Sequence, residues 1–186
     1  MKKMMFFLGV IAIAFSTRLA AQQTKIFMSM GNEITGSATE VGYEHNLQIL
    51  SYSQGASSCS QTASQGGSGS GAGACKVSSS DFSFMMEMDR SIIKLKEYIY
   101  TGKRIPVVVV RFVKGGGESR PAVYYKITLN NVVISALQES GSSEPPSVSF
   151  SLSPESIAWE YSEQNQDGQM GTPLKFSWDL RRSRSF

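Results

Sequence analysis

Hydrophobic and polar residues alternate along most of the chain, as they do in β-strands that bury one face. The alternation is complete in residues 147–153, where Val148, Phe150 and Leu152 are separated by serines. The other segments of alternating or β-branched apolar residues are 25–30, 46–53, 81–88, 105–113, 122–137, 157–161 and 174–180. Short segments at this spacing predict about eight strands.

The period of the apolar residues changes in one place. Ile92, Leu95 and Ile99 recur at spacings of three, four and seven, which is typical of one face of a helix. Ser91 comes directly before this stripe and is expected to be its N-cap, while Gly102 is expected to be its C′ residue. We therefore predict one α-helix, joined directly to the strand at 81–88.

The connections between the predicted strands are mostly short, which favours antiparallel pairing. The expected fold is mainly β, an antiparallel barrel or sandwich of about eight strands with one α-helix flanking the barrel. Val132, Val133 and Ile134 interrupt the alternation after Asn130 and Asn131. They predict a bulge, or a strand buried on both faces, at that point.

Residues 1–21 have the composition of a secretory signal peptide. Lys2 and Lys3 precede the apolar residues 4–15, and a small-residue cleavage site follows. The alternative is a membrane anchor, but about 12 apolar residues are too few to cross a bilayer, which takes roughly 20. We expect residues 22–186 to form a single domain that is exported to the periplasm or the extracellular space, without stable membrane insertion.

The charge balance changes when the predicted signal peptide is removed. That peptide carries three of the 18 basic residues and none of the 15 acidic ones, so the remainder holds 15 of each. A neutral protein has no overall charge with which to attract nucleic acid, and no nucleic-acid partner is expected. The basic residues at the end of the chain are expected to form a solvated, mobile tail, with a specific anion site as the alternative; they are Arg181, Arg182 and Arg184.

Residues 54–76 consist almost entirely of small and polar residues, with a glycine-rich run at 66–73. This composition buries little apolar surface and predicts a long loop, and such loops in compact domains are often functional. Cys59 and Cys75, the two cysteines of the chain, both lie in it, and in an exported protein they are expected to form a disulfide. A metal site is the alternative, but the pair lacks further ligands at suitable spacing.

The sequence contains little that predicts catalysis. His45 is the single histidine, and its neighbour Glu44 would point to the opposite face of a strand. No nucleophile motif or phosphate-binding glycine loop precedes the predicted helix. Trp159 and Trp178 lie on the apolar side of alternating segments and predict core packing rather than a sugar-binding face. We expect no enzyme, no cofactor and no metal.

Taken in order, several segments together resemble the Hcp (haemolysin-coregulated protein) family, the tube subunit and secreted component of type VI secretion systems. The likeness covers roughly residues 25–180. The segments that carry it are 26–28, the glycine-rich loop, 81–84 continuing through 88–91 into the helix, 125–132 with Ser135, 155–161 and 176–180.

This resemblance implies a β-barrel that assembles into hexameric rings, with rings stacking into a tube that carries or accompanies effectors. Secreted effectors or a spike protein are the implied partners, and no catalysis is implied. The family's long loop reaches towards a neighbouring ring, which assigns ring contacts to Gln54, Gly55, Gln65, Gly66, Gly67, Gly69, Gly71 and Lys76.

The signal peptide and the cysteine pair depart from the family pattern, because a tube is built in the cytoplasm. We therefore expect an exported Hcp-like protein that acts outside the cytoplasm. The alternative is a monomeric exported β-barrel that serves as a binding or adhesion module without a role in a tube.

Overall fold

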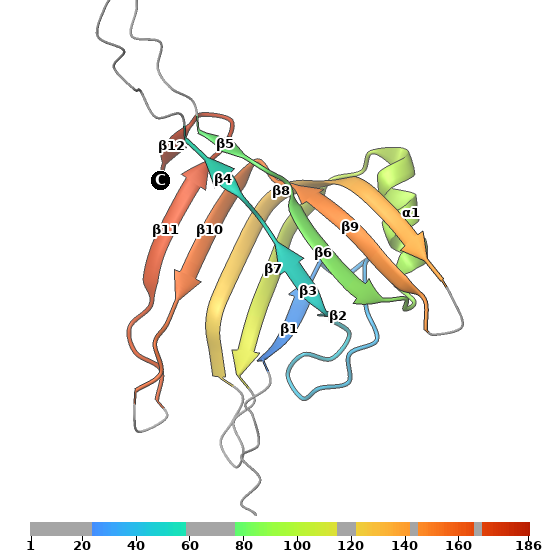
Figure 1. Ribbon diagram of the computed structural model, residues 1–186, viewed down its shortest axis with the longest axis horizontal. Coiled ribbons are helices and arrows are strands. Elements are labelled where there is room, and N and C mark those ends of the chain that lie inside the picture. The colour runs from blue at the N-terminus through green and yellow to red at the C-terminus, as the bar shows by residue number, and fades with distance from the viewer. Residues whose placement is uncertain (1–23, 59–76, 115–121, 142–144, 166–168) are drawn as a thin grey trace, which may run out of the picture.

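The computed structural model describes residues 24–58, 77–114, 122–141, 145–165 and 169–186. These residues form a mainly β, antiparallel structure with one helix, so the predicted fold class is confirmed (Figure 1). The elements are β1 (Thr24–Ser29), β2 (Leu47–Ile49), β3 (Ser51–Ser53), β4 (Ala56–Ser57), β5 (Ser78–Ser79), β6 (Phe82–Glu87), α1 (Ile92–Thr101), β7 (Ile105–Lys114), β8 (Ala122–Ser140), β9 (Ser147–Ser153), β10 (Ser156–Tyr161), β11 (Leu174–Asp179) and β12 (Arg184–Ser185).

The barrel closes through a strand that is divided in two. Antiparallel pairing runs from β1 through β7, β8, β9 and β6 to β3, and β2 returns it to β1. The sequence predicted one strand at 46–53, but Leu50 separates β2 from β3. The Leu50 amide donates a hydrogen bond to the Met85 carbonyl at 2.8 Å, so the chain passes from β1 to β6 at this residue.

Strand β8 belongs to the barrel and also carries an extension of the sheet. On one edge, Tyr125 to Asn130 pair with β10, whereas Val133 to Ser140 pair with β9. β11 then pairs with β10, and β12 with β11. We call β10, β11 and β12 the wing; β10 and β11 lie at the left of Figure 1, on the opposite side from α1.

One bulge of β8 follows directly after the segment in which the sequence predicted it, and a second bulge was not predicted. In the pairing with β7, a shift in register leaves Tyr124 as the extra residue opposite Phe112 and Val113. In the pairing with β9, a second shift leaves Ser135 as the extra residue opposite Ser151 and Leu152. At the predicted position, the strand changes its neighbour and Asn131 has a φ of 51°. Apolar residues follow Asn131 consecutively because β8 passes there from one sheet partner to another.

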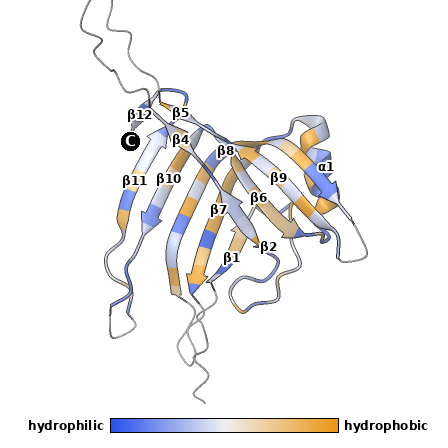
Figure 2. Ribbon diagram, viewed as in Figure 1, coloured by the Kyte–Doolittle hydropathy of each residue, from blue (hydrophilic) through white to orange (hydrophobic). Residues whose placement is uncertain are grey.

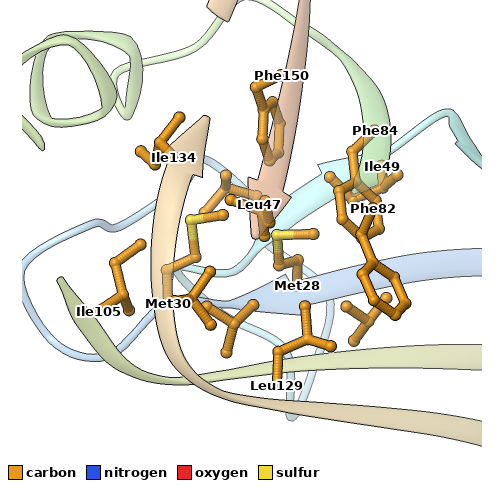
Figure 3. Packing of buried hydrophobic residues seen from close by; sticks show 14 of the residues in the cluster. Met28, Met30, Leu47, Ile49, Phe82, Phe84, Ile105, Leu129, Ile134 and Phe150 are labelled. Atoms are coloured by element: carbon orange, nitrogen blue, oxygen red, sulfur yellow. The ribbon is translucent and has the colours of Figure 1, made fainter. Parts of the chain in front are cut away.

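The core fills the barrel with side chains from every strand of its wall. Figure 3 shows part of this cluster, including Met28, Leu129 and Phe150. Phe82, Phe84 and Met86 are buried as predicted, while Met88, predicted for the same face, lies beyond the end of β6 and is partly exposed. Figure 2 shows apolar and polar residues alternating along part of β8, whereas β7 is apolar over most of its length.

Helix α1 packs against β8 at one end of the barrel. Ile92 and Leu95 are buried as the periodicity predicted, but Ile99 is only half-buried. Tyr98 takes the third buried position, and its hydroxyl donates a hydrogen bond to Glu33 at 2.9 Å. The helix is not long and apolar enough to cross a membrane.

The two ends of α1 differ in how well the sequence predicted them. Gly102 has a φ of 66° and donates its amide to the Tyr98 carbonyl, which confirms the C′ prediction. The Ser91 side chain makes no capping bond, so the N-cap prediction is wrong in its mechanism. Instead, Asp89 Oδ1 accepts the Ser91 amide at 2.9 Å, and Asp89 Oδ2 accepts the Ser37 amide at 2.9 Å. Asp89 therefore joins the helix to the loop after β1.

The C-terminal arginines are exposed to solvent, as predicted, but they are attached to the wing and so do not form the predicted mobile tail. Arg184 pairs with Asp179 in the β11–β12 register. Arg181 Nη1 lies 3.2 Å from Glu155 Oε2, and Arg182 Nη1 lies 3.8 Å from Asp179 Oδ2. Backbone pairing and these two carboxylates hold the C-terminal segment in place. Its composition alone shows only that the segment is polar and charged.

Candidate assembly surfaces

The apolar face of the main sheet continues from the barrel into the wing. The register places Ile157 beside Leu129 and Trp178, and places Trp159 beside Ile127 and Phe176. These side chains therefore lie on the face that forms the barrel core. Ile157 is completely buried, but Phe176 is 53% exposed and Leu174 is 75% exposed. The wing thus presents a core-type face to solvent.

Aromatic rings make up most of this wing face. Trp159 stacks on Phe176 with ring centroids 5.6 Å apart, and Phe176 stacks on Trp178 at 6.2 Å. Trp159 packs against the barrel core and is half-buried, as is Trp178. The prediction that both tryptophans belong to the core is therefore only partly right, because the outer edge of their stack is open. We call Trp159, Tyr161, Leu174, Phe176 and Trp178 the aromatic face.

Hydroxyl groups at the border of the aromatic face remain uncharged. Tyr52 packs edge-on against Phe112 with centroids 5.5 Å apart, close to Tyr125. Burial raises the pKa of the Tyr52 hydroxyl to about 12, and the neighbouring Tyr125 adds to this shift. Burial also raises the pKa of Tyr125. Both phenols stay protonated at neutral pH, so no charge opposes apolar contact here.

The opposite face of the wing is polar and paired by charge. Glu160 accepts Lys126 Nζ at 2.5 Å and lies 3.3 Å from Lys175 Nζ. The hydrogen bond from Lys126 holds the pKa of Glu160 below its usual range, with a further contribution from Lys175. The two faces of β10 and β11 therefore differ sharply, one made of aromatic rings and the other of ion pairs.

A second exposed apolar patch lies on the other side of the barrel. Leu50, Met85 and Met88 are 51%, 39% and 37% exposed. Leu50 and Met85 are joined by a backbone hydrogen bond, and Met88 follows the end of β6. In Figure 1, β6 lies on the right-hand side and β11 at the left margin. The methionine patch, as we call these three residues, is thus separate from the aromatic face.

Of the predicted ring-contact loop, only the base lies in the described part of the chain. Gln54 donates its side-chain amide to Ser79 Oγ at 3.2 Å, and Gly55 and Ser80 exchange hydrogen bonds of 2.8 and 2.9 Å. This polar base continues into the β4–β5 hairpin. The remaining predicted contact residues and both cysteines lie outside the described residues; they are Gln65, Gly66, Gly67, Gly69, Gly71, Lys76, Cys59 and Cys75.

The residues considered for catalysis do not form a site. His45 is exposed, with Nδ1 3.3 Å from Arg90 Nη2, while Glu44 accepts the amide of Gly42 instead of contacting the imidazole. Within the described ranges, no three histidine, cysteine or acidic side chains are grouped so that they could hold a metal ion.

Residues 27–161, more than half of the chain, match the family model described as "Type VI secretion system effector, Hcp". The chain belongs to the Hcp family. The resemblance predicted from the ordered segments is thereby confirmed, while the signal peptide remains a prediction. A curated member, Protein hcp1 of Pseudomonas aeruginosa, is 30% identical over 111 residues, which cover 58% of this chain and 68% of that protein.

Solved structures of Hcp proteins share the fold. A structure titled as a type six secretion system protein has a TM-score of 0.75 at 19% identity and covers 88% of this chain and 100% of its own. Hcp1 from Salmonella typhimurium has a TM-score of 0.69 at 22% identity, with 88% and 99% covered. A type VI secretion system effector from Yersinia pestis scores 0.62 at 19% identity, with 83% and 98% covered. At these identities the likeness concerns the fold.

Proposed function

We propose that this member of the Hcp family is a ring-forming structural protein of the type VI secretion tube type. It assembles as hexameric rings that stack and carry or accompany secreted effectors, and it acts after export by its signal peptide. The single observation that carries this proposal is the aromatic face, a core-type surface that the barrel leaves uncovered.

The energetics of the aromatic face favour self-association. Burying a large apolar side chain that is otherwise exposed contributes about 1.5 to 3 kcal/mol. Leu174 and Phe176 are more than half exposed, and Tyr161 is 46% exposed. A partner that covers these three residues gains a substantial part of the free energy that association requires. The same aromatic residues are typical of the centres of protein interfaces.

The positions of the two apolar patches favour a head-to-tail contact. The aromatic face lies on the wing, whereas the methionine patch lies at β6, on the other side of the barrel in Figure 1. A contact between unlike surfaces of identical chains repeats around an axis and closes as a ring when the rotation allows it. We infer that the aromatic face of one copy covers the methionine patch of the next. Family membership supports six copies in the ring.

The loop at 54–76 is assigned the contact between stacked rings. Gln54 and Gly55 anchor its base in a hydrogen-bonded serine ladder. A disulfide between Cys59 and Cys75 would limit the entropy lost when the loop orders on a neighbour, and such a bond persists in the compartment to which the signal peptide delivers the chain. Mass spectrometry after alkylation without reductant tests it: protein from the periplasm with two alkylated cysteines contradicts the disulfide.

The assembly is tested with the protein lacking residues 1–21. Light scattering after size exclusion is expected to show hexamers, and negative-stain images are expected to show rings. The double substitution Leu174→Ser, Phe176→Ser should give monomers. Lys175→Ser is the matched control, because Lys175 lies between these residues on the opposite face of β11 and its side chain is 62% exposed.

The two outcomes separate assembly from the monomeric alternative. If the protein without residues 1–21 stays monomeric at high concentration and shows no rings, the ring proposal fails and a monomeric binding module remains. If Lys175→Ser disrupts the rings as strongly as the double substitution does, the aromatic face is not the contact surface.

A further inference from the structure

A row of charged side chains crosses the polar face of the main sheet. The strand registers place Arg111 of β7 beside Lys126 of β8, Lys126 beside Glu160 of β10, and Glu160 beside Lys175 of β11. Successive strands lie about 4.8 Å apart, so these four side chains are close neighbours on one face. The row therefore contains three cations and a single carboxylate.

The carboxylate in this row is already used by the two lysines. Glu160 Oε1 accepts Lys126, and Glu160 Oε2 lies 3.3 Å from Lys175. Within the described part of the chain, Arg111 has neither a carboxylate nor a hydrogen-bond partner for its guanidinium. Moreover, like charges directly opposite each other on neighbouring strands destabilise a sheet. The Arg111–Lys126 pair is such an arrangement, and an anion would relieve it.

The row borders a pocket of about 240 Å³. Arg111, Lys126 and Glu160 line it, together with Tyr124 and Ser162. Tyr124 is the extra residue of the β8 bulge, and bulges re-aim side chains next to binding sites. Lys114 Nζ lies 5.0 Å from the centre of the Tyr124 ring, which brings another positive charge to the pocket wall.

We propose that this pocket binds a phosphate or sulfate group. The four-residue row has a net charge of plus two, which matches a dianion. The planar guanidinium of Arg111 donates two parallel hydrogen bonds to such a group, and Lys126 adds a point charge beside it. A monocarboxylate would neutralise only half of the excess charge. The site is independent of the aromatic face, because it lies on the opposite side of the same strands.

The test is a titration of the folded protein with inorganic phosphate at constant ionic strength, followed by calorimetry and by amide chemical shifts. Phosphate is expected to bind in competition with sulfate and to raise the thermal midpoint. Arg111→Gln should weaken binding at least tenfold while the protein remains folded. Arg111→Lys keeps the positive charge but loses the two parallel donors of the guanidinium. It should weaken phosphate binding less than Arg111→Gln does.

Arg182→Gln is the matched control, since it removes an arginine outside the row. It should bind phosphate as the wild type does. The proposal is overturned if wild-type protein shows no saturable binding above the chloride control, if Arg182→Gln is impaired equally, or if acetate binds as tightly as phosphate. Glycerol 3-phosphate identifies the source of the group. If it binds as tightly as inorganic phosphate, the site accepts a phosphate ester; if it binds more weakly, the site selects the free ion.

Discussion

The barrel and the wing are two parts of one sheet with the same sequence pattern and opposite exposure. Phe84 in the barrel and Phe176 in the wing are both inward-facing residues of alternating strands, yet Phe84 is 2% exposed and Phe176 is 53% exposed. The barrel face is covered by strands across the core, whereas no described element covers the outer part of the wing. Alternation thus identifies the residues that share a face, while the topology decides whether that face is buried.

The largest effect is expected from truncating the same residue type in the two regions. Phe84→Ala should lower the free energy of unfolding by about 3 to 5 kcal/mol, because it leaves a cavity in the barrel core. Phe176→Ala should cost the monomer less than about 1 kcal/mol, since its ring is already half in water. Chemical denaturation at low protein concentration measures both. Equal losses would contradict the distinction between barrel and wing.

A pair of glycines extends the comparison to two connecting segments, Gly36 between β1 and β2 and Gly55 just before β4. A Cβ atom at Gly36 would lie 2.3 Å from the Asn46 carbonyl oxygen and 2.6 Å from its carbon, so the backbone would have to shift. Gly36→Ala should therefore destabilise the protein by about 1 to 3 kcal/mol. At Gly55 the nearest atom is the Ser80 hydroxyl oxygen at 3.5 Å, which is ordinary contact. Thermal unfolding should show almost no change for Gly55→Ala.

The helix cap tests the contribution of polar contacts in the barrel. Asp89→Ala removes the acceptor of the Ser91 and Ser37 amides and should cost about 1 to 2 kcal/mol. Asp89→Asn keeps an acceptor oxygen and should lose less. Denaturation curves of the two variants give the comparison. If both variants are as stable as the wild type, Asp89 does not cap α1.

The smallest effect is expected on the polar face of the wing. Because Lys126 lowers the pKa of Glu160, this carboxylate stabilises the folded state above its unfolded pKa of 4.5, and the contribution disappears as pH falls through the lower folded pKa. Glu160 is partly exposed, so the contribution is below about 1 kcal/mol. In Glu160→Gln the thermal midpoint should fall less steeply as the pH is lowered than it does in the wild type. Thermal unfolding at a series of pH values measures this. An unchanged slope would contradict this role for Glu160.

Local pattern was enough to predict the helix, every described strand except β4, β5 and β12, and the residues that share a face of each strand. Residues 147–153 and 92–101 match their predicted elements closely, because their periodicity reports directly on which side chains leave water. The Hcp resemblance also came from the order of local segments. These are features that a short stretch of sequence determines by itself.

Other features depend on contacts between distant segments, and the sequence did not predict them. The division at Leu50 follows from the separate positions of β1 and β6, and the capping role of Asp89 involves Ser37. The ordering of Arg181 depends on Glu155. Phe176 is exposed because no described element packs over it. The alternating pattern of β11 is the same as that of a buried strand and does not reveal this exposure.

The pairing of β1 with β7 also sets the order in which the chain can fold. β7 and β8 are consecutive in sequence and can pair early, whereas Ile26 must meet Phe112 across all the intervening strands and the helix. Closing so large a loop is slow, since its entropy is lost before the contacts form. During synthesis β1 therefore cannot pair with β7 until β7 has left the ribosome. The barrel remains unclosed until most of the chain has been synthesised.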